Sequence, residues 1–358
     1  MIKSAYIHIP FCKQKCKYCS FVSFTNIDKI NIYIDSLIED INSNYKGEAL
    51  NTLYFGGGTP SLLDIEFLSK IINIFKLNTD CEVTLEMNPD DASLDYLQSL
   101  FDIGINRISI GSQTFDDNVL NLIGRRHNSK QVFNAIKFAD KAGFKNISLD
   151  LIYGLPFVNL KNDLEIISDL GIKHVSTYGL KIEENSYWGK FPPQNIPNDD
   201  EQADMYTMIN DFLGKKGYKR YEISNFAIPG YESRHNLNYW DNNEYYGFGL
   251  ASHGYVNGIR YSKSQIFDKY INNPTNFENK QVLTIQEKLE EEIFLGFRKA
   301  EGLDINKIQE KYGIDFNTKY NSILNKFMPD YIEKTKSGYK LTLNGVLLSN
   351  NILAEFID

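Results

Sequence analysis

Residues 5–19 read AYIHIPFCKQKCKYC and carry three of the four cysteines of the chain. The β-rich start of this stretch predicts a strand, and Cys12, Cys16 and Cys19 follow on a loop with C-x3-C-x2-C spacing. Thiolates are soft ligands, and iron–sulfur clusters are held by several cysteines that are close in sequence. Three thiolates leave one iron of a [4Fe–4S] cluster open to the amino and carboxylate groups of a small molecule.

A zinc ion is the alternative for the same cysteines. A structural zinc site closes with four protein ligands, and His8 is the nearby residue that could approach as a fourth. The clustering of the cysteines argues against a secreted disulfide framework and favours metal ligation in a reducing compartment. Cys81 stands alone in an apolar-alternating segment, which predicts a small buried side chain.

Composition limits the class of protein. The chain has 358 residues, 42% of them hydrophobic and 23% charged, which predicts a folded protein with a sizeable core. The formal net charge of −8 disfavours a general affinity for nucleic acid. No apolar run approaches the roughly 18 residues that span a bilayer, and the N-terminus lacks the apolar core of a signal peptide. We expect a cytoplasmic protein without a transmembrane segment. A peripheral contact with a membrane remains compatible with the sequence.

Strand-like and helical segments alternate through the first half of the chain. β-rich runs lie at 5–9, 52–55, 82–86, 107–110, 147–152 and 174–179. Helical patterns lie between them, so the segments repeat as strand-then-helix units, which imply a parallel sheet with right-handed crossovers. The predicted fold class is α/β, as a partial (β/α)6 barrel, with a doubly wound sheet as the alternative.

The unusual residues of this half fall where the predicted strands end. Cys12, the glycines at 56–58, Glu86, Gln113 and Asp150 all lie at or just after such ends. In parallel α/β folds this edge of the sheet carries the active site. Three glycines after a strand expose backbone groups to a close ligand, although on their own they equally suit a plain turn.

The pattern changes after about residue 180. Helices are predicted over 199–216, 304–312 and 317–327, with a Ser-Gly turn at 337–338 between two β-like runs. Thr284 and Glu287 have the spacing of a capping box that opens another helix. These features predict a small, mainly helical, winged-helix-like C-terminal domain. The predicted division is a core barrel at 1–232, a connecting region at 233–280 and the C-terminal domain at 281–358.

The cysteine loop resembles that of the radical S-adenosylmethionine (SAM) superfamily. Residues 56–60, GGGTP, are similar to its glycine motif, and Tyr18 fits the aromatic residue that precedes its third cysteine. Further stretches at 6–12, 86–89, 107–115 and 150–156 resemble the coproporphyrinogen III oxidase-like group, which contains an oxygen-independent oxidase and a haem chaperone. The similarity runs through essentially the whole chain.

This resemblance implies a [4Fe–4S] cluster on the three loop cysteines, SAM, and a cellular reductant for the cluster. The residues that it implies for SAM are Tyr6, Tyr18, Gly57, Gly58, Thr59, Glu86, Gln113, Arg125 and Asp150. Their chemistry is suitable, because arginine forms bidentate pairs with carboxylates and glutamate accepts from an ammonium group. Each has a structural alternative, such as an arginine–carboxylate salt bridge at the rim.

Three features separate the two branches of this group. In the oxidase the third cysteine is followed by x-Cys and a long extension precedes the first strand, whereas here Ser20 and Phe21 follow Cys19 and the chain starts almost at that strand. Residues 235–240, HNLNYW, resemble a motif of the haem chaperone. By this resemblance His235 is the candidate axial ligand of haem, with an ordinary hydrogen-bonded packing role as the alternative. His253 is a weaker candidate.

The resemblance therefore implies a protein that binds haem and transfers it to apo-haemoproteins. The alternative is the enzyme that oxidatively decarboxylates coproporphyrinogen III to protoporphyrinogen IX, and a radical-SAM enzyme with another substrate is a third hypothesis. The missing x-Cys and the HNLNYW sequence favour the chaperone. The fold alone does not decide between these hypotheses, because sites rather than folds determine function. The sequence assigns no catalytic residue.

Overall fold

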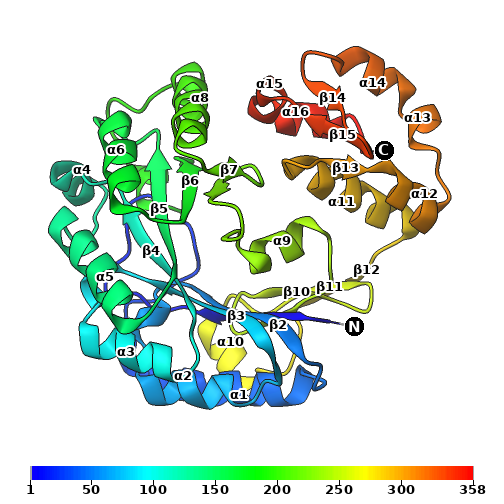
Figure 1. Ribbon diagram of the computed structural model, residues 1–358. Helices are drawn as coiled ribbons and strands as arrows, with labels where there is room; N and C mark the ends of the chain where they lie inside the picture. The colour runs from blue at the N-terminus through cyan, green and yellow to red at the C-terminus, as the bar shows by residue number, and fades with distance from the viewer. Residues whose placement is uncertain (1, 358) are drawn as a thin grey trace.

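Six parallel strands form the centre of a nine-stranded sheet in the computed structural model, which describes residues 2–357 (Figure 1). The six are β1 (Ser4–Ile9), β2 (Leu50–Gly57), β3 (Leu77–Met87), β4 (Arg107–Gln113), β5 (Asn146–Tyr153) and β6 (His174–Gly179). Each pairs in parallel with the next one in chain order. All six β-rich runs of the sequence are therefore strands of one parallel sheet, as predicted.

Both edges of this unit are covered by later parts of the chain. β9 (Tyr246–Phe248) pairs in parallel with β1, whereas β8 (Asn225–Ala227) pairs antiparallel with β6 and carries β7 (Lys219–Arg220) on its far side. The strand that precedes the cysteine loop thus lies inside the sheet and not at its edge.

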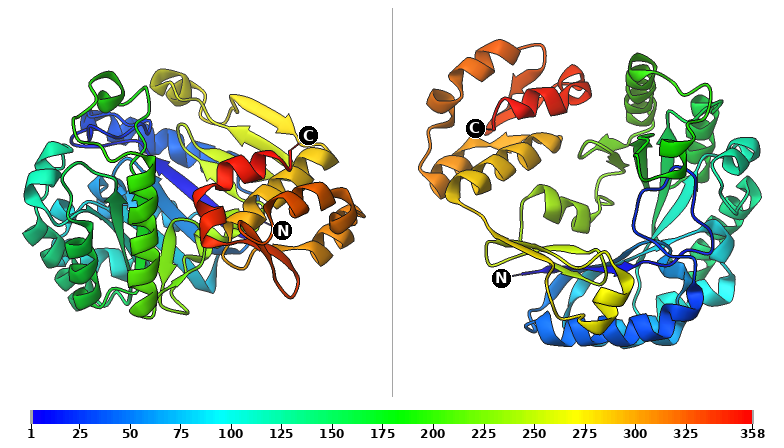
Figure 2. Two further views of the ribbon diagram at one scale, coloured as in Figure 1. Left: turned by 90° about the horizontal axis from the view of Figure 1, so that it is seen from above. Right: turned by 180° about the vertical axis from the view of Figure 1, so that it is seen from behind.

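Helices cover the outer side of the sheet (Figures 1 and 2). They are α1 (Ile30–Asn44), α2 (Ile65–Ile72), α3 (Leu94–Asp102), α4 (Asp117–Leu122), α5 (Ser129–Ala142), α6 (Leu160–Leu170) and α8 (Asp199–Lys215). Shorter helices lie in the connections, at η1 (Ile27–Lys29), η2 (Pro60–Leu62), η3 (Pro89–Asp91) and α7 (Tyr187–Lys190). Because the strands keep chain order, without the reversal that defines a doubly wound sheet, the fold is the predicted partial (β/α)6 barrel.

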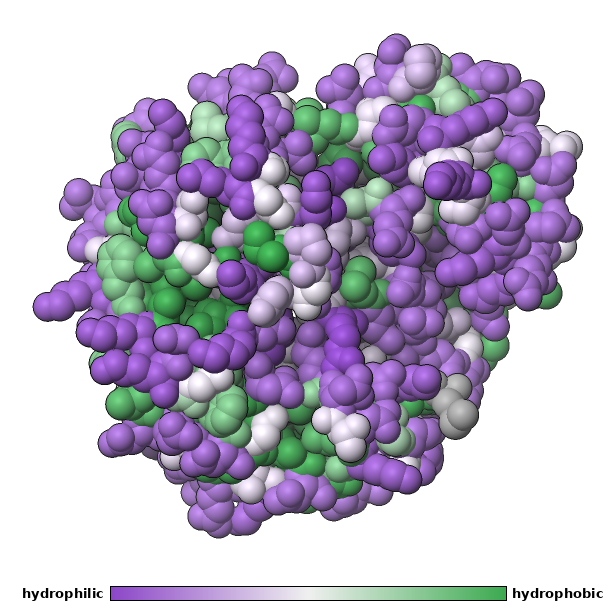
Figure 3. Space-filling view, in the orientation of Figure 1, coloured by the Kyte–Doolittle hydropathy of each residue, from purple (hydrophilic) through white to green (hydrophobic). Residues whose placement is uncertain are grey.

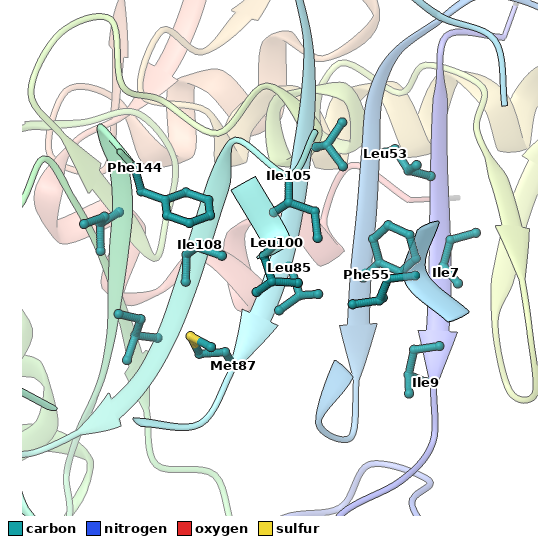
Figure 4. Close-up of a cluster of buried hydrophobic side chains, with 14 of the residues drawn as sticks. Ile7, Ile9, Leu53, Phe55, Leu85, Met87, Leu100, Ile105, Ile108 and Phe144 are labelled. Atoms are coloured by element: carbon teal, nitrogen blue, oxygen red, sulfur yellow. The ribbon is translucent and has the colours of Figure 1, made fainter. Parts of the chain in front are cut away.

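Alternation along the strands separates an apolar outer face from a polar inner face. Ile7, Leu53 and Leu85 are fully or almost fully buried and point to the helix side, where Leu100 of α3 joins them (Figure 4). Successive side chains of a strand point to opposite faces, so the intervening residues face the barrel interior. The period of two in the sequence therefore decides which side chains can reach a ligand inside the barrel.

A second sheet and two helices follow the barrel strands. The sheet consists of β10 (His253–Val256), β11 (Ile259–Ser262) and β12 (Asn279–Val282), and the helices are α9 (Arg234–Trp240) and α10 (Phe267–Asn272). A buried ion pair fastens this part to α1, because Lys263 Nζ lies 2.6 Å from Asp40 Oδ1 and both side chains are fully buried. Asp40 also accepts from the backbone N–H of Gly249 at 3.1 Å.

The C-terminal part has a hydrophobic core of its own, built mainly from residues between Leu289 and Phe356. It contains α11 (Ile285–Arg298), β13 (Leu303–Asp304), α12 (Ile305–Tyr312), α13 (Phe316–Lys319), α14 (Asn321–Phe327), β14 (Ile332–Lys334), β15 (Gly338–Leu341), α15 (Leu343–Leu347) and α16 (Ser349–Ala354). The capping box of Thr284 and Glu287 is confirmed at the start of α11. The helix predicted over 317–327 is divided at Tyr320 into α13 and α14, whereas the mainly helical character is as predicted.

The surface is hydrophilic over most of the face shown in Figure 3, with apolar side chains scattered between charged ones. Within residues 2–357, every helix is too short or too polar to cross a bilayer. The exact division of the chain at 232 and 280 stays a prediction.

Candidate functional site

The three loop cysteines lie between β1 and α1, and each is half-buried with a free thiol. Backbone hydrogen bonds hold their loop at two points: Cys12 N–H donates to Phe24 O at 3.0 Å, and Lys17 N–H donates to Ile123 O at 3.0 Å. Burial raises the pKa of the Cys19 thiol, and the neighbouring Cys16 and Cys12 raise it further. The sequence motif therefore produces a fixed group of thiols at the C-terminal edge of the sheet.

A cavity of about 440 Å³ opens beside this loop and is lined by all three cysteines. Eight of the nine residues expected to bind SAM also line it. These are Tyr18, Gly57, Gly58, Thr59, Glu86, Gln113, Arg125 and Asp150. Residues from six separate segments thus meet at one cavity, at the edge of the sheet where parallel α/β folds place their active sites.

The thiols suit a cluster of several iron atoms. In residues 2–357, no three His, Cys, Asp or Glu side chains are placed to hold one metal ion together. A [4Fe–4S] cluster needs no such convergence, since each thiolate binds a separate iron. Three soft donors that line a single cavity fit the group, and the polar walls of the cavity fit a charged small molecule beside it.

Glu86 at the end of β3 is held in position by two neutral donors. Its carboxylate accepts from the Tyr54 hydroxyl at 2.8 Å and from the Gly57 backbone N–H at 3.2 Å. Burial raises the pKa of Glu86 to about 7, and the nearby carboxylate of Asp150 adds to this rise. A cationic partner, such as the ammonium group that the family resemblance implies for Glu86, would stabilise its charged form and lower this pKa.

Asp150 on β5 faces the same cavity and accepts from the Ser109 hydroxyl at 3.1 Å. Burial raises its pKa as well. Gln113 follows an irregularity in the pairing of β4 with β5 and has a φ of 65°, which turns the chain at the strand end. Such left-handed conformations are uncommon outside glycine and often occur at functional sites.

Arg125 does not form the rim salt bridge that was the structural alternative. Its Nη1 donates to Cys16 Sγ at 3.5 Å, and its Nη2 donates to the backbone O of Gly111 at 2.7 Å and to the side-chain Oδ1 of Asn88. All three acceptors are uncharged groups or a cysteine sulfur. The guanidinium is therefore aimed at the cysteine loop while it lines the cavity.

Asn88 is a site residue that the sequence reasoning missed. It lies directly after β3 and lines the cavity, with its amide between Arg125 and Thr59. A signal was present, because Asn88 stands in the quoted stretch 86–89 at a strand end. An asparagine before a proline also suits an ordinary turn, so the stretch alone did not indicate a role.

The two tyrosines expected to bind SAM, Tyr18 and Tyr6, have different surroundings, because only Tyr18 lines the cavity. Tyr18 lines the cavity and packs beside Trp188, with ring centroids 6.5 Å apart. Tyr6 lies outside the cavity lining, and its hydroxyl is hydrogen-bonded to His8 Nδ1 at 3.0 Å. Contact between Tyr6 and SAM stays a prediction, and the position of Tyr6 outside the cavity lining does not support it.

His235 on α9 lies in the barrel interior with 1% of its surface exposed. Its Nδ1 lies 2.8 Å from Thr52 Oγ1, and its Nε2 lies 2.8 Å from the Tyr239 hydroxyl. Since Thr52 donates its only proton to Ser4, Nδ1 carries the hydrogen and Nε2 accepts from Tyr239. Burial lowers the pKa of His235 to about 3, which keeps this ring neutral.

Both ring nitrogens of His235 are therefore occupied in the described conformation, and the side chain has the structural role that was its alternative. Axial ligation of haem by His235 stays a prediction, and it requires the bond to Tyr239 to open. His253 on β10 is exposed, but it lies outside the lining of the cavity.

The sequence matches two family models. The model of the radical SAM superfamily matches residues 6–170, and the model of the HemN C-terminal domain matches residues 283–348. The solved structure of the coproporphyrinogen III oxidase HemN from Escherichia coli is similar in fold, with a TM-score of 0.87 and coverage of 99% of this chain and 90% of that one. At 22% identity this similarity concerns the fold alone.

The radical SAM family implies SAM and a [4Fe–4S] cluster. Curated relatives carry the name heme chaperone HemW. The protein from Lactococcus lactis (strain IL1403) is 39% identical over 99% of this chain and 97% of its own length. That from Bacillus subtilis (strain 168) is 37% identical, with 99% of both chains covered. On this full-length similarity, the chain belongs to the HemW family of radical SAM proteins.

Proposed function

We propose that this protein is a haem chaperone, which binds haem and transfers it to apo-haemoproteins. The observation that carries the proposal is the full-length similarity to proteins of that name. The proposal also includes a cytoplasmic location and a cellular reductant for the cluster. The cavity beside the cysteine loop is the proposed functional centre.

Cys12, Cys16 and Cys19 are the proposed ligands of the cluster, since they line one cavity with free thiols. Bound there, the cluster supplies one-electron chemistry and an open iron. Glu86 would pair with the ammonium group of SAM, because its carboxylate is preorganised by Tyr54. Asp150 would accept from ribose hydroxyls beside Ser109. These side chains bind and orient the ligand, and the half-buried cavity restricts water around it.

The position of Phe21 supports the proposal that a porphyrin binds at this cavity. Phe21 stands at the position where the oxidase has its additional cysteine, it lines the cavity, and 67% of its surface is exposed. Tyr178 on β6 lines the same cavity and is 44% exposed. Because both side chains line one cavity, their aromatic faces are available to pack on the flat, apolar macrocycle of haem.

We retain His235 as the proposed axial ligand of haem, provided that its hydrogen bond to Tyr239 opens. Its Nε2 lone pair must leave the Tyr239 hydroxyl before it can reach iron. Tyr239→Phe removes that competing donor and keeps the aromatic ring. If Nε2 ligates haem, Tyr239→Phe binds haem more tightly than the wild type, and His235→Ala binds it more weakly.

The chaperone and oxidase hypotheses are separated on one anaerobically reconstituted sample. Haem titration followed at the Soret band is expected to show saturable binding, and the bound haem is expected to pass to an apo-haemoprotein. Incubation with coproporphyrinogen III, SAM and a reductant is expected to leave that substrate unchanged. Its conversion to protoporphyrinogen IX would contradict the chaperone proposal. In a matched pair, Phe21→Ala should weaken haem binding and Phe21→Tyr should retain it.

A further inference from the structure

A chain of hydrogen bonds joins two of the loop cysteines through side chains from three other segments. Thr59 Oγ1 donates to Cys12 Sγ at 3.5 Å, and Asn88 Nδ2 donates to Thr59 Oγ1 at 3.0 Å. At the other end, Arg125 donates from Nη2 to Asn88 Oδ1 and from Nη1 to Cys16 Sγ at 3.5 Å. Asn88 is thus the central member, and the two outer members both end on sulfur.

The direction of every bond in this chain follows from the chemistry of Arg125. A guanidinium has donors only, so the amide of Asn88 must turn its oxygen toward Arg125 and its NH2 group toward Thr59. The Thr59 oxygen then accepts from Asn88, which leaves the single hydroxyl proton of Thr59 free to point at Cys12. Asn88 therefore orients a donor toward a sulfur that it does not itself contact.

Gly111 leaves room for the guanidinium of Arg125, because glycine has no side chain. A Cβ placed on Gly111 would lie 3.1 Å from Arg125 Nη2 and 2.8 Å from Gln113 Nε2. The guanidinium can therefore lie against the end of β4, where its Nη2 donates to the backbone O of Gly111 at 2.7 Å. Thr59 is equally confined, with 4% of its surface exposed. Both donors are fixed by the fold before any ligand binds.

We propose that Thr59 and Arg125, aligned by Asn88, are redox-tuning residues that donate hydrogen bonds to the cluster thiolates of Cys12 and Cys16. The inference rests on the proposed cluster ligation by these two cysteines. One-electron reduction adds one negative charge to the cluster and its thiolates and breaks no bond. Hydrogen bonds to the sulfurs and a nearby positive charge stabilise the reduced state most, so they raise its reduction potential. The effect lets a milder one-electron donor, of the ferredoxin or flavodoxin type, reduce the cluster.

This role differs from binding of SAM by the same residues, and the two are separated by measuring without SAM. Thr59→Val removes the hydroxyl and keeps the shape, whereas Thr59→Ser keeps the hydroxyl. The reconstituted full-length variants are titrated with dithionite and mediators, and the reduced cluster is followed by EPR. Thr59→Val is expected to shift the midpoint potential to a more negative value, and Thr59→Ser is expected to match the wild type.

Asn88→Leu provides a second, independent variant, because it removes the aligning amide and leaves both donors in place. Its midpoint potential is also expected to fall. Iron and sulfide are quantified first, so that each comparison uses the same cluster content. An unchanged potential in both Thr59→Val and Asn88→Leu overturns the proposal, and so does loss of the cluster in both, which assigns them to cluster retention. Failure of the wild type to bind haem would overturn the proposed chaperone function, but it would not change the inference about the reduction potential of the cluster.

Discussion

His235→Ala tests the structural role of this histidine in the haem-free protein, and its cost in stability can be worked out from the contacts of the ring. The substitution removes the bonds to Thr52 and Tyr239, which contribute about 1 kcal/mol each. It also leaves a cavity where the imidazole stacks on Tyr54 at a centroid distance of 4.9 Å, which costs about 1–2 kcal/mol more. We expect the free energy of unfolding to fall by about 3–4 kcal/mol without haem.

Thermal unfolding of the haem-free protein is the assay. At roughly 2 °C per kcal/mol for a large chain, Tm should fall by roughly 6–8 °C. His253→Ala is the matched control, because that side chain is exposed, and its Tm should equal that of the wild type. A His235→Ala variant with the wild-type Tm would refute the structural role, since two buried bonds cannot be lost at no cost.

The remaining predictions concern the thiols, Glu86 and the buried ion pair. Cys16→Ala should abolish the cluster while Cys81→Ala retains it, as measured by iron and sulfide analysis, because Cys81 is 5% exposed and its burial raises its pKa to about 12. SAM affinity, measured by anaerobic equilibrium binding, should rise about tenfold from pH 6 to pH 8 as Glu86 ionises around its pKa of about 7, and Glu86→Gln should abolish this dependence. Because the pKa of Glu86 is raised from 4.5 to about 7 in the folded protein, ionisation of its buried carboxyl lowers the free energy of unfolding as pH rises between these two values. SAM binds the ionised form, so saturation with SAM should raise Tm more at pH 8 than at pH 6. Lys263→Met should destabilise the fold by about 3–5 kcal/mol because Asp40 stays buried without its counter-charge, and adding Asp40→Asn should restore part of the loss in a denaturant titration.

The sequence was sufficient for the strands and for the residues at their ends. Period-two alternation in 52–55 and 82–86 decides which side chains face the helices, and parallel pairing brings the strand ends to one edge. For this reason Glu86 and Asp150, far apart in the chain, could be placed at one edge of the sheet from local patterns alone, and in the structure both line one cavity.

Contacts between side chains of different segments could not be predicted in this way. The position of Asn88 between Thr59 and Arg125 depends on how β2 and β3 pair and on where the loop after α4 lies, which no local pattern encodes. The bonds of His235 depend in the same way on how α9 packs against β2. The motif indicated that this histidine matters, but its partners came only from the three-dimensional arrangement.

Short pairings between distant segments were also invisible in the sequence. Residues 246–248 are too few to give a strand pattern, yet they pair with β1 across more than half of the chain. The division of the predicted helix at Tyr320 is a similar case, since apolar periodicity continues through the break.

That long-range pairing gives the protein an order of assembly during synthesis. β1 leads directly into the cysteine loop, and on its outer side it has hydrogen-bond partners only once β9 has been made. Until then the backbone beside the cysteines is an open strand edge, which is prone to pairing with other chains. A ribosome-bound fragment that ends before residue 246 would therefore expose this edge, and the growing chain protects it when the segment that carries β9 emerges.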